Sequence, residues 1–570
     1  MKKLVLYIIF FAVMSAVALL PLFHSGFFTM HDDQQIARLY ELTQILHQGQ
    51  LPPRWVPDLG FGYGYALFDF YPPLVYYLGF LVHSLGFGYI DSTKIVMGLG
   101  FVLSALFMFL WIRKRFGTVP GLVAATLYTY APYHAVDLYV RGAFAEFFSF
   151  VWIPAVFWSF DMLSEKKTWK WTLITGILLS FVLLTHDLIA MQASVFIAGY
   201  MCWTLFEKRT EWKKVILWYI VAGGIALGLT AYFWLPSLVD KQYTLVDAIL
   251  TKDLASYQLH FVCLKQLWTG PWGYGASIPE CSDQLSFEIG KMHLIASGVA
   301  LLLLLVAWLK GKKEKTGFIL FLFLNLFVAT WLTTSKSLFL WNMIKPFAYI
   351  QFPWRFLLFS ALFSSSLTGV VVWQIGRFSQ KGAWVAAILI GCISIGLMAG
   401  NMHPENYLSK SDKDYTSYQD IAWRISRSSY EYVPKEVRTV KSDINTTLVA
   451  ITPDTIASSP AIILSGKATI LTQKNTAADK SFLIHATSQA TIRINTFAYP
   501  GWMVFVDGRQ VTPDTNNPLH LLTVSVPTGE HSIVAVFRET SPRLVADMVS
   551  LITLIICILI SGIFAKRHVQ

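Results

Sequence analysis

The chain has 570 residues, of which 55% are hydrophobic, 15% are aromatic and only 14% are charged. Soluble domains carry roughly a quarter of their residues as charged side chains. This composition therefore excludes a soluble globular protein and predicts an α-helical protein that crosses a membrane many times. The net charge of +11 would suit a nucleic-acid partner, but its distribution along the chain excludes one.

Lysine and arginine gather in short clusters between apolar segments. The clusters lie at 2–3, 113–115, 166–170, 208–214, 310–315, 377–381 and 566–567. Together they hold more positive charge than the whole chain, so the remaining residues are net negative. Loops on the cytoplasmic side of a membrane carry such an excess of Lys and Arg. The basic charge therefore indicates topology and not a surface for nucleic acid.

The first apolar segment covers residues 4–23 and follows Lys2 and Lys3. It predicts a membrane anchor with the N-terminus in the cytoplasm. A cleaved signal peptide is the alternative, but about 20 apolar residues exceed the usual apolar region of such peptides. Asp32 and Asp33, which follow this anchor, then emerge on the outer face of the membrane.

Residues 34–48 form the next expected element. Ile36, Leu39, Leu42 and Leu46 recur close to helical spacing, which predicts an amphipathic helix lying at the membrane interface. An ordinary loop helix packed on the bundle is the alternative. Both interpretations place the Asp32-Asp33 pair at the N-terminal end of the helix, where the helix dipole favours carboxylates.

Further apolar segments alternate with the basic clusters along the chain. They lie at 68–87, 94–112, 118–133, 143–163, 171–186, 188–206, 214–236, 291–309, 317–334, 354–376, 382–400 and 544–565. With every basic cluster inside, residues 24–67, 134–142, 237–290, 335–353 and 401–543 lie outside, with a tight outer turn at 185–187. We therefore predict a multi-pass protein of the cell membrane with about 12–13 spans.

One conflict remains in this topology. Segments 68–87 and 94–112 must together cross the membrane an odd number of times. Either 68–87, which contains Pro72-Pro73, is a re-entrant or surface helix, or the basic cluster at 113–115 breaks the rule. We favour the first alternative.

Residues 401–543 differ in character from the rest of the chain. Short runs that mix apolar and polar residues predict β-strands at 461–464, 468–471, 491–494, 502–506 and 531–537. Asp507-Gly508, between two of these runs, is a hairpin signal. The expected domains are a transmembrane domain at 1–400 with external loops 24–67 and 237–290, a β-rich, sandwich-like extracytoplasmic domain at 401–543, and a C-terminal anchor with a basic tail at 544–570.

Two of the five cysteines, Cys263 and Cys281, fall in the external loop 237–290. In an oxidising compartment they form either a disulfide or two free thiols, and the sequence leaves both open. The other three, Cys202, Cys392 and Cys557, lie within apolar segments.

Charged and polar residues that lie close to the membrane core are costly and mark functional sites. With the topology above, nearly all of them lie on the outer side: Asp32, Asp33, Arg54, Asp58, Asp69, His134, Asp137, Arg141, Glu146, His186, Asp187, Lys345 and Arg355. This asymmetry predicts an outward-facing site. Each residue also has a structural interpretation, such as a helix cap at Asp32-Asp33, an ion pair of Arg141 with Glu146, a polar turn at His186-Asp187, and snorkelling of Arg355 to the interface.

Motifs for metal or nucleotide chemistry are absent from the sequence. No His or Cys pairs stand at zinc-like intervals, and no P-loop or dinucleotide glycine pattern occurs. A hard divalent cation, Mg²⁺ or Mn²⁺, held by Asp32 together with phosphate oxygens is compatible with the sequence.

Several motifs resemble those of one bacterial family of multispanning membrane proteins. They are Pro52-Pro53-Arg54-Trp55, Gly62-Tyr63-Gly64, Phe70-Tyr71-Pro72-Pro73-Leu74, Ala131-Pro132-Tyr133, Arg141-Gly142-Ala143-Phe144-Ala145-Glu146 and Gln351-Phe352-Pro353-Trp354-Arg355-Phe356. That family is often labelled as related to 6-pyruvoyl-tetrahydropterin synthase, a small soluble zinc enzyme whose ligand set has no counterpart here. Tyr499-Pro500-Gly501-Trp502 and Val506-Asp507-Gly508 resemble the outer domain of the related YfhO-type membrane proteins.

The membrane part is similar to the GT-C superfamily of glycosyltransferases, which take sugars from polyprenyl-phosphate carriers at the outer face. This resemblance implies a carboxylate base in the first external loop, which maps onto Asp32 with Asp33 as the alternative. It also implies that Arg355, with Arg141 or Arg54, neutralises the leaving phosphate. The remaining candidates for substrate binding are Tyr71, Glu146, His186 and Asp187. The acceptor would be an extracytoplasmic glycan, lipid or protein.

Two other functions fit the same sequence. A scaffold or accessory protein for envelope-polymer assembly would use the β domain to bind glycan and the Asp32-Asp33 pair as a helix cap. A lipid or substrate transporter would show paired charges near the bilayer midplane and internal repeats, whereas the charges here gather near one face.

Overall fold

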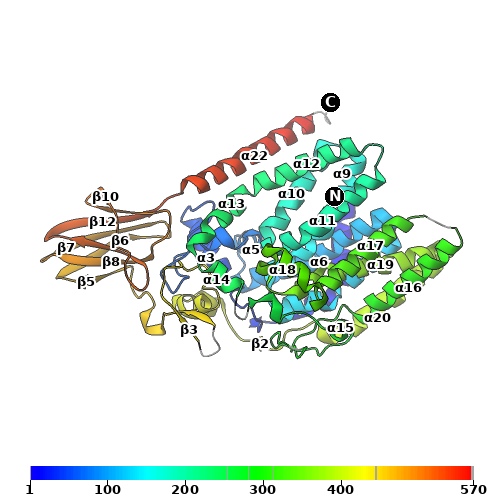
Figure 1. Ribbon diagram of the computed structural model, residues 1–570, viewed down its shortest axis with the longest axis horizontal. Coiled ribbons are helices and arrows are strands. Elements are labelled where there is room, and N and C mark those ends of the chain that lie inside the picture. Colours follow the sequence, from blue (N-terminus) through cyan, green and yellow to red (C-terminus); the bar gives the residue numbers. More distant parts are fainter. Residues whose placement is uncertain (1, 253–254, 280, 312–313, 443–445, 567–570) are drawn as a thin grey trace.

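The computed structural model describes residues 2–252, 255–279, 281–311, 314–442 and 446–566. A large helical bundle lies beside a separate group of β-strands (Figure 1), and the last helix, α22 (Ser541–Lys566), leads from the strands back along the bundle. It packs against α12 (Trp212–Leu229) and α13 (Ala231–Asp240). The predicted fold class, a polytopic helical protein with a β domain before the last span, is confirmed. The basic tail at 567–570 lies outside the described residues.

Among the described residues, eight helices are long and apolar enough to cross a membrane, or up to ten if two bent pairs each count as one span. The eight are α6 (Tyr89–Phe116), α9 (Phe144–Lys166), α11 (Asp187–Glu207), α12, α16 (Lys291–Leu309), α19 (Leu357–Gly376) with its preceding turn, α20 (Gln380–Met398) and α22. The bent pairs are α1 (Lys2–Met14) with α2 (Ala16–Leu19) and its following turn, and α17 (Thr316–Leu332) with the segment up to α18 (Leu338–Met343).

This number is lower than the 12–13 spans that the sequence predicts. The reason is length, because three apolar segments form shorter helices: α5 (Leu74–His83), α7 (Thr118–Thr129) and α10 (Trp169–Thr185). The 10 residues of α5 rise about 15 Å, half of the hydrocarbon thickness. A helix of this length fits the re-entrant or surface alternative for segment 68–87.

Five of the seven basic clusters, those at 113–115, 166–170, 208–214, 310–315 and 377–381, lie together at one end of the bundle. Ion pairs join them to each other's helices: Lys114–Glu165, Arg115–Asp161, Arg115–Glu207, Lys167–Glu211 and Arg377–Glu314. In addition, the Lys315 ammonium donates a hydrogen bond to the main-chain carbonyl of Arg115. The loops that carry these clusters therefore share one side, as the alternating topology requires.

The β domain consists of two antiparallel sheets. The larger has the order β10 (Arg509–Val511), β9 (Trp502–Val506), β12 (Gly529–Phe537), β7 (Asp479–Ala486) and β6 (Ala468–Asn475). The smaller has the order β11 (Leu521–Val526), β8 (Ala490–Phe497) and β5 (Ala461–Ser465). Buried residues alternate along β7 (Phe482, Ile484) and β8 (Ile492, Ile494), as expected for strands that cover a shared core.

The five predicted strands are all present, and Asp507 and Gly508 form the two-residue turn between β9 and β10. Both residues have a positive φ, 50° and 77°, which a hairpin turn of this length needs in order to follow the strand twist. The sequence did not indicate β7 and β11, because β7 begins with Asp-Lys and β11 follows a polar loop.

A helical segment between α20 and the β domain runs back to the first loop of the bundle. β2 (Tyr407–Leu408) pairs with β1 (Phe27–Phe28), and α21 (Asp412–Thr416) packs against α3 (Gln35–His47). Most residues of α3 are buried inside the protein. The expected helix at 34–48 therefore matches the alternative of a loop helix packed on the bundle.

Candidate functional site

A cavity of about 1080 Å³ lies where the predicted external loops meet. Each of the segments 24–67, 134–142, 237–290, 335–353 and 401–543, together with the turn at 185–187, contributes side chains to its wall. None of the loops with basic clusters does so among the described residues. Residues more than 400 positions apart in the chain thus surround one space.

Seven of the nine candidate residues line this cavity. They are Asp32, Tyr71, Arg141, Glu146, His186, Asp187 and Arg355. The other two, Asp33 and Arg54, lie elsewhere. These seven residues come from separate loops that meet in the folded protein. The sequence indicated this meeting, because its charged residues gather on one side of the membrane.

The two neighbouring carboxylates differ sharply in their surroundings. The main-chain N–H of Asp32 donates to the carbonyl of Arg141 over 2.8 Å, which holds the residue beside α9. Its carboxylate makes no hydrogen bond or ion pair with any residue that the structure describes, and it lines the cavity. Asp33 instead pairs with the guanidinium of Arg424 outside the cavity. Burial raises the pKa of Asp33, while Arg424 acts in the opposite direction.

Glu146 holds two arginines of the cavity wall in place. Its Oε2 accepts from Nε of Arg355 over 3.0 Å and pairs with Nη1 of Arg141 over 2.9 Å, and its Oε1 accepts from the Tyr133 hydroxyl over 2.6 Å. Asp137 also pairs with Arg141. We call Asp137, Arg141, Glu146 and Arg355 the cavity cluster.

The arginines of the cavity cluster retain N–H groups for a ligand. Arg355 uses Nε for Glu146 and Nη1 for the Ile350 carbonyl (2.6 Å) and the Gln351 side chain (3.3 Å). Arg141 makes its hydrogen bonds and ion pairs through Nη1. In the described part of the chain, Nη2 of both residues has no hydrogen bond. The two arginines are therefore held in place, but each keeps N–H groups that no described residue uses.

Arg54 lies away from the cavity, in contrast to its expected role in substrate binding. It is fully buried and bonds through all three nitrogens, to Asp69 (2.8 Å), Glu539 (3.2 Å), Asp547 (2.6 Å) and the Tyr232 carbonyl (2.8 Å). Arg543 completes this group by pairing with Asp69 (3.3 Å) and Asp240 (2.8 Å). We call Arg54, Asp69, Asp240, Glu539, Arg543 and Asp547 the junction network, because it joins the first loop to α13 and α22.

His186 and Asp187 lie at the turn between α10 and α11. Nδ1 of His186 accepts from the main-chain N–H of Ile189 over 3.3 Å and thereby caps α11. The Asp187 carboxylate accepts from the N–H of Leu188 over 2.8 Å, and its side chain is 41% exposed. The polar-turn interpretation and a position on the cavity wall are both correct for this pair.

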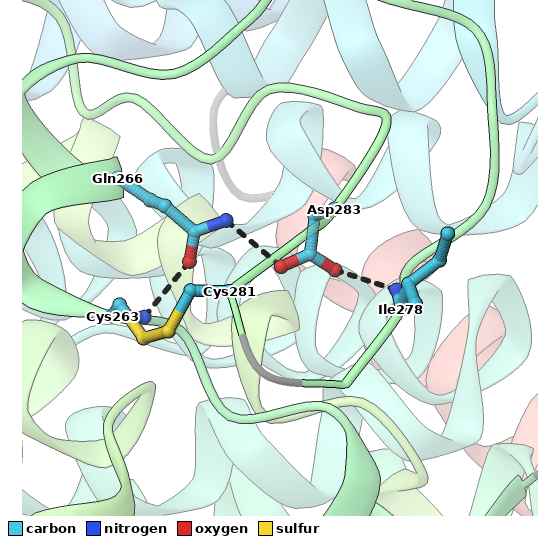
Figure 2. Close-up of a disulfide and its surroundings, with 5 residues drawn as sticks. All are labelled: Cys263, Gln266, Ile278, Cys281 and Asp283. Atoms are coloured by element: carbon cyan, nitrogen blue, oxygen red, sulfur yellow. Dashed lines mark hydrogen bonds between the residues drawn. A yellow bond between two sulfur atoms is a disulfide. The ribbon is translucent and has the colours of Figure 1, made fainter.

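A disulfide joins Cys263 and Cys281 and settles the alternatives left open by the sequence (Figure 2). Beside it, the Gln266 side chain accepts from the N–H of Cys263 (2.9 Å) and donates to Asp283 (2.8 Å). Asp283 also accepts from the N–H of Ile278 over 2.9 Å. Because Ile278 lines the cavity, these bonds fix the loop that forms this part of its wall.

Apolar side chains form another part of the wall. They come from α13, from α14 (Val246–Leu250) and from the disulfide-bearing loop: Leu238, Val246, Ile249, Leu250, Leu259, Ile278 and Leu285. The cavity therefore combines a charged end near Asp32 with an apolar side, which suits a ligand that has both a polar and a hydrocarbon part.

A divalent cation held by Asp32 together with phosphate oxygens stays a prediction. Among the described residues, no group of three or more His, Cys, Asp or Glu side chains stands close enough to hold one. Glu146 on the wall and Asp137 behind Arg141 are both engaged by arginines.

The sequence did not single out several residues of the wall. Arg38 from α3, Trp354 from the turn before α19, and Glu431 and Tyr432 from a turn between α21 and the β domain all line the cavity. Arg38 was recognisable only as a charged residue among the apolar positions of an amphipathic helix. For Glu431 and Tyr432 the sequence held no signal, because they lie within 401–543, which was expected to be the β domain.

No family model matches the chain, so the resemblance to the YfhO-type family stays a prediction. An uncharacterized protein of Lactococcus lactis subsp. cremoris is 23% identical over 230 residues, which are 39% of this chain and 38% of that protein. The matched region thus spans well under half of either chain.

Three solved structures are similar in part. Arabinofuranosyltransferase AftD from Mycobacteria has a TM-score of 0.42 at 12% identity, covering 70% of this chain and 27% of that chain. The Archaeoglobus fulgidus oligosaccharyltransferase, in complex with zinc and sulfate, has 0.42 at 12%, covering 72% and 57%. ArnT from Cupriavidus metallidurans, bound to undecaprenyl phosphate, has 0.29 at 11%, covering 71% and 89%.

Proposed function

We propose that this protein transfers a sugar from a polyprenyl-phosphate carrier to a hydroxyl group of an acceptor outside the cell membrane, with Asp32 as the base. One observation carries this proposal. In a cavity with an apolar side, an unpaired carboxylate shares the wall with arginines that retain free N–H groups. A base and a binding site for a departing phosphate are the two groups that such a transfer needs.

The transfer is a displacement at the anomeric carbon of the sugar. The acceptor oxygen forms a bond to this carbon, and the bond from the carbon to the phosphate oxygen breaks. The proton of the acceptor hydroxyl passes to Asp32, and the electron pair of the broken bond leaves with the polyprenyl phosphate. Since phosphate is a good leaving group, positioning and charge stabilisation supply most of the rate.

The cavity cluster provides the charge stabilisation. The phosphate gains negative charge as it departs, and the free Nη2 groups of Arg355 and Arg141 can donate to its oxygens. Glu146, buried between the two guanidinium groups, fixes their positions beforehand. Asp33 is not used, because Arg424 occupies its carboxylate.

The topology supplies the orientation. Since the five basic clusters between helices share one end of the bundle, this end lies in the cytoplasm by the positive-inside rule. The cavity, which the other loops line, then faces outward, together with the β domain. The apolar residues of α13, α14 and the disulfide-bearing loop accommodate the hydrocarbon chain of the carrier.

The test compares Asp32→Asn with Asp33→Asn in membranes that contain native acceptors, at matched expression, with a panel of labelled polyprenyl-phosphate sugars. General-base removal costs about 10²–10⁴-fold in rate. We expect such a loss for Asp32→Asn and less than a few-fold loss for Asp33→Asn. Equal activity of Asp32→Asn and the unaltered protein would contradict the base assignment. Absence of transfer from every donor would contradict the function.

A further inference from the structure

We propose that α18 lies in the plane of the membrane and rests the face that carries Phe339 and Met343 in the outer leaflet. In the topology that the sequence predicts, residues 335–353 are an external loop, which would surround this helix with water. The placement in lipid goes beyond the proposed function and does not depend on it. Three features of α17 and α18 support it: the angle between them, the side chains that α18 exposes, and the contact that joins these to α17.

α18 leaves the preceding apolar helix at a right angle. α17 and the segment Ser335–Met343, which contains α18, enclose an angle of 93°. Lys315, just before α17, belongs to the basic end of the bundle. From there the 17 residues of α17 rise about 25 Å, close to the hydrocarbon thickness of about 30 Å. A helix that turns by a right angle at this point runs along the outer surface of the membrane.

One face of α18 is apolar and exposed. Phe339 is 64% exposed and Met343 69%, and side chains four residues apart share one face of a helix. Trp341 on the other side is 1% exposed, and its ring stacks on Tyr257 with the centroids 5.2 Å apart. The Tyr257 hydroxyl also donates to Asn342 over 2.8 Å. The loop 237–290 therefore holds one side of α18, while Phe339 and Met343 point outward.

The exposed face of α18 continues the exposed side of α17. Leu320, Leu324 and Phe327 are exposed along α17, and Trp331 follows them at the same helical spacing. Lipid covers such a stripe in a protein that crosses the membrane, and Trp is typical of the level at which the hydrocarbon ends. The rings of Trp331 and Phe339 are in contact, with the centroids 5.8 Å apart. The surface that lipid covers on α17 thus extends to Phe339.

The charges that flank α18 favour phospholipid over a protein partner. Lys336 precedes the helix and Lys345 follows it, and residues 316–351 contain no Asp or Glu. Both lysines are exposed, and neither forms an ion pair with another residue that the structure describes. Lysines beside an apolar face extend their ammonium groups to lipid phosphates. A second copy of this chain, docked face to face, would add two lysines and no carboxylate from this segment.

The position of α18 also bears on the cavity. The helix leads into the turn Lys345–Ile350, in which Pro346 and Tyr349 line the cavity. A helix that is anchored among the lipid headgroups therefore holds this part of the cavity wall at the membrane surface.

The experiment measures the depth of α18 in the full chain, reconstituted in phospholipid nanodiscs, by electron paramagnetic resonance of nitroxide labels. The free thiols of Cys202, Cys392 and Cys557 are first replaced by Ser, and the disulfide stays intact. Each label is then tested for collisions with oxygen, which concentrates in lipid, and with a water-soluble nickel complex.

Four single-cysteine variants carry the label. Phe339→Cys and Met343→Cys report on α18, and Leu302→Cys on α16 and Leu471→Cys on β6 are the controls. Leu302 is 63% exposed and Leu471 62%, which matches the 64% of Phe339. The controls therefore differ from Phe339 in their surroundings and not in how far the protein covers them: Leu302 lies within an apolar helix and Leu471 in the β domain.

We expect the ratio of oxygen to nickel collisions at positions 339 and 343 to exceed the ratio at 471 about tenfold, because apolar surroundings exclude a polar complex. The ratio at 302 should be higher still. The two positions on α18 should lie at equal depth, whereas a helix along the membrane normal would separate them by about 6 Å.

A ratio at 339 equal to that at 471 would place this face in water and overturn the proposal. A label that neither reagent reaches would indicate a protein partner, and a depth equal to that of 302 would indicate a re-entrant helix; both results also overturn it. Where Phe339→Cys does not yield folded protein, Met343→Cys decides between lipid and water. None of these measurements involves sugar transfer, so the placement of α18 and the proposed function can fail separately.

Discussion

Two groups of buried arginines and carboxylates lie in this protein, and they differ in how completely their charges are paired. The junction network surrounds Arg54 with three carboxylates and a carbonyl, so that all three of its nitrogens are bonded. The cavity cluster leaves Nη2 of Arg141 and of Arg355 without a hydrogen bond in the described chain. Of the two groups, only the cavity cluster contributes side chains to the wall of the described cavity.

This comparison separates structure from function among residues of the same type. Arg54 belongs to a sequence motif, as Arg141 and Arg355 do, and all three are buried. A saturated arginine has nothing left to offer a ligand, whereas an arginine with free N–H groups beside a cavity does. The junction network instead holds α13, α22 and the first loop together.

The largest expected effect comes from Arg54→Met. Removal of one partner from a buried ion pair costs about 3–5 kcal/mol, and this substitution leaves Glu539 and Asp547 without their cation, although Asp69 keeps Arg543. We expect a loss of that size in the free energy of unfolding, measured by SDS titration in mixed micelles. Substrate affinity of the folded fraction should not change, and a change there would break the distinction between the two groups.

Arg355→Met should reduce the rate of transfer more than it reduces stability. Removal of one donor that stabilises transition-state charge costs about 10²-fold in rate, which corresponds to about 2.7 kcal/mol. The loss of stability should be smaller than for Arg54→Met, because Glu146 keeps its pair with Arg141. The measurement is the rate of sugar transfer beside the same SDS titration. A variant that loses stability but transfers at the normal rate would place Arg355 with the structural residues.

The smallest expected effect comes from Lys480, which lies where β7 contacts the first loop. It is 5% exposed, and burial lowers its pKa to about 8, while Asp58 acts in the opposite direction. Above pH 8 the folded protein loses this proton before the unfolded chain does. The contribution of Lys480 to stability therefore rises with pH between about 8 and its ordinary pKa of 10.5.

The check compares the unfolding midpoints of the unaltered protein and Lys480→Met at pH 7.5 and pH 9. We expect the variant to be the more stable at pH 7.5, and its advantage to shrink by about 1 kcal/mol at pH 9. Parallel pH profiles of the two proteins would contradict this expectation. Transfer activity should be equal throughout, since Lys480 does not line the cavity.

The sequence by itself determined most helices of the bundle and several strands of the β domain. Long apolar segments specify helices because the backbone must satisfy its own hydrogen bonds in lipid, and α6, α9, α11 and α20 follow the predicted segments closely. The two-residue turn Asp507-Gly508 fixed one hairpin in the same local manner. The one-sided distribution of charge indicated that Asp32, Arg141 and Arg355 share one side.

Only the tertiary structure decided which charges have partners. Asp32 and Asp33 are adjacent in the chain, yet Arg424, almost 400 residues later, occupies one carboxylate and leaves the other in the cavity. Arg54 is likewise saturated by Glu539 and Asp547 from the far end of the chain. Pairing over such separations depends on how helices and loops pack, and local sequence patterns carry no information about it.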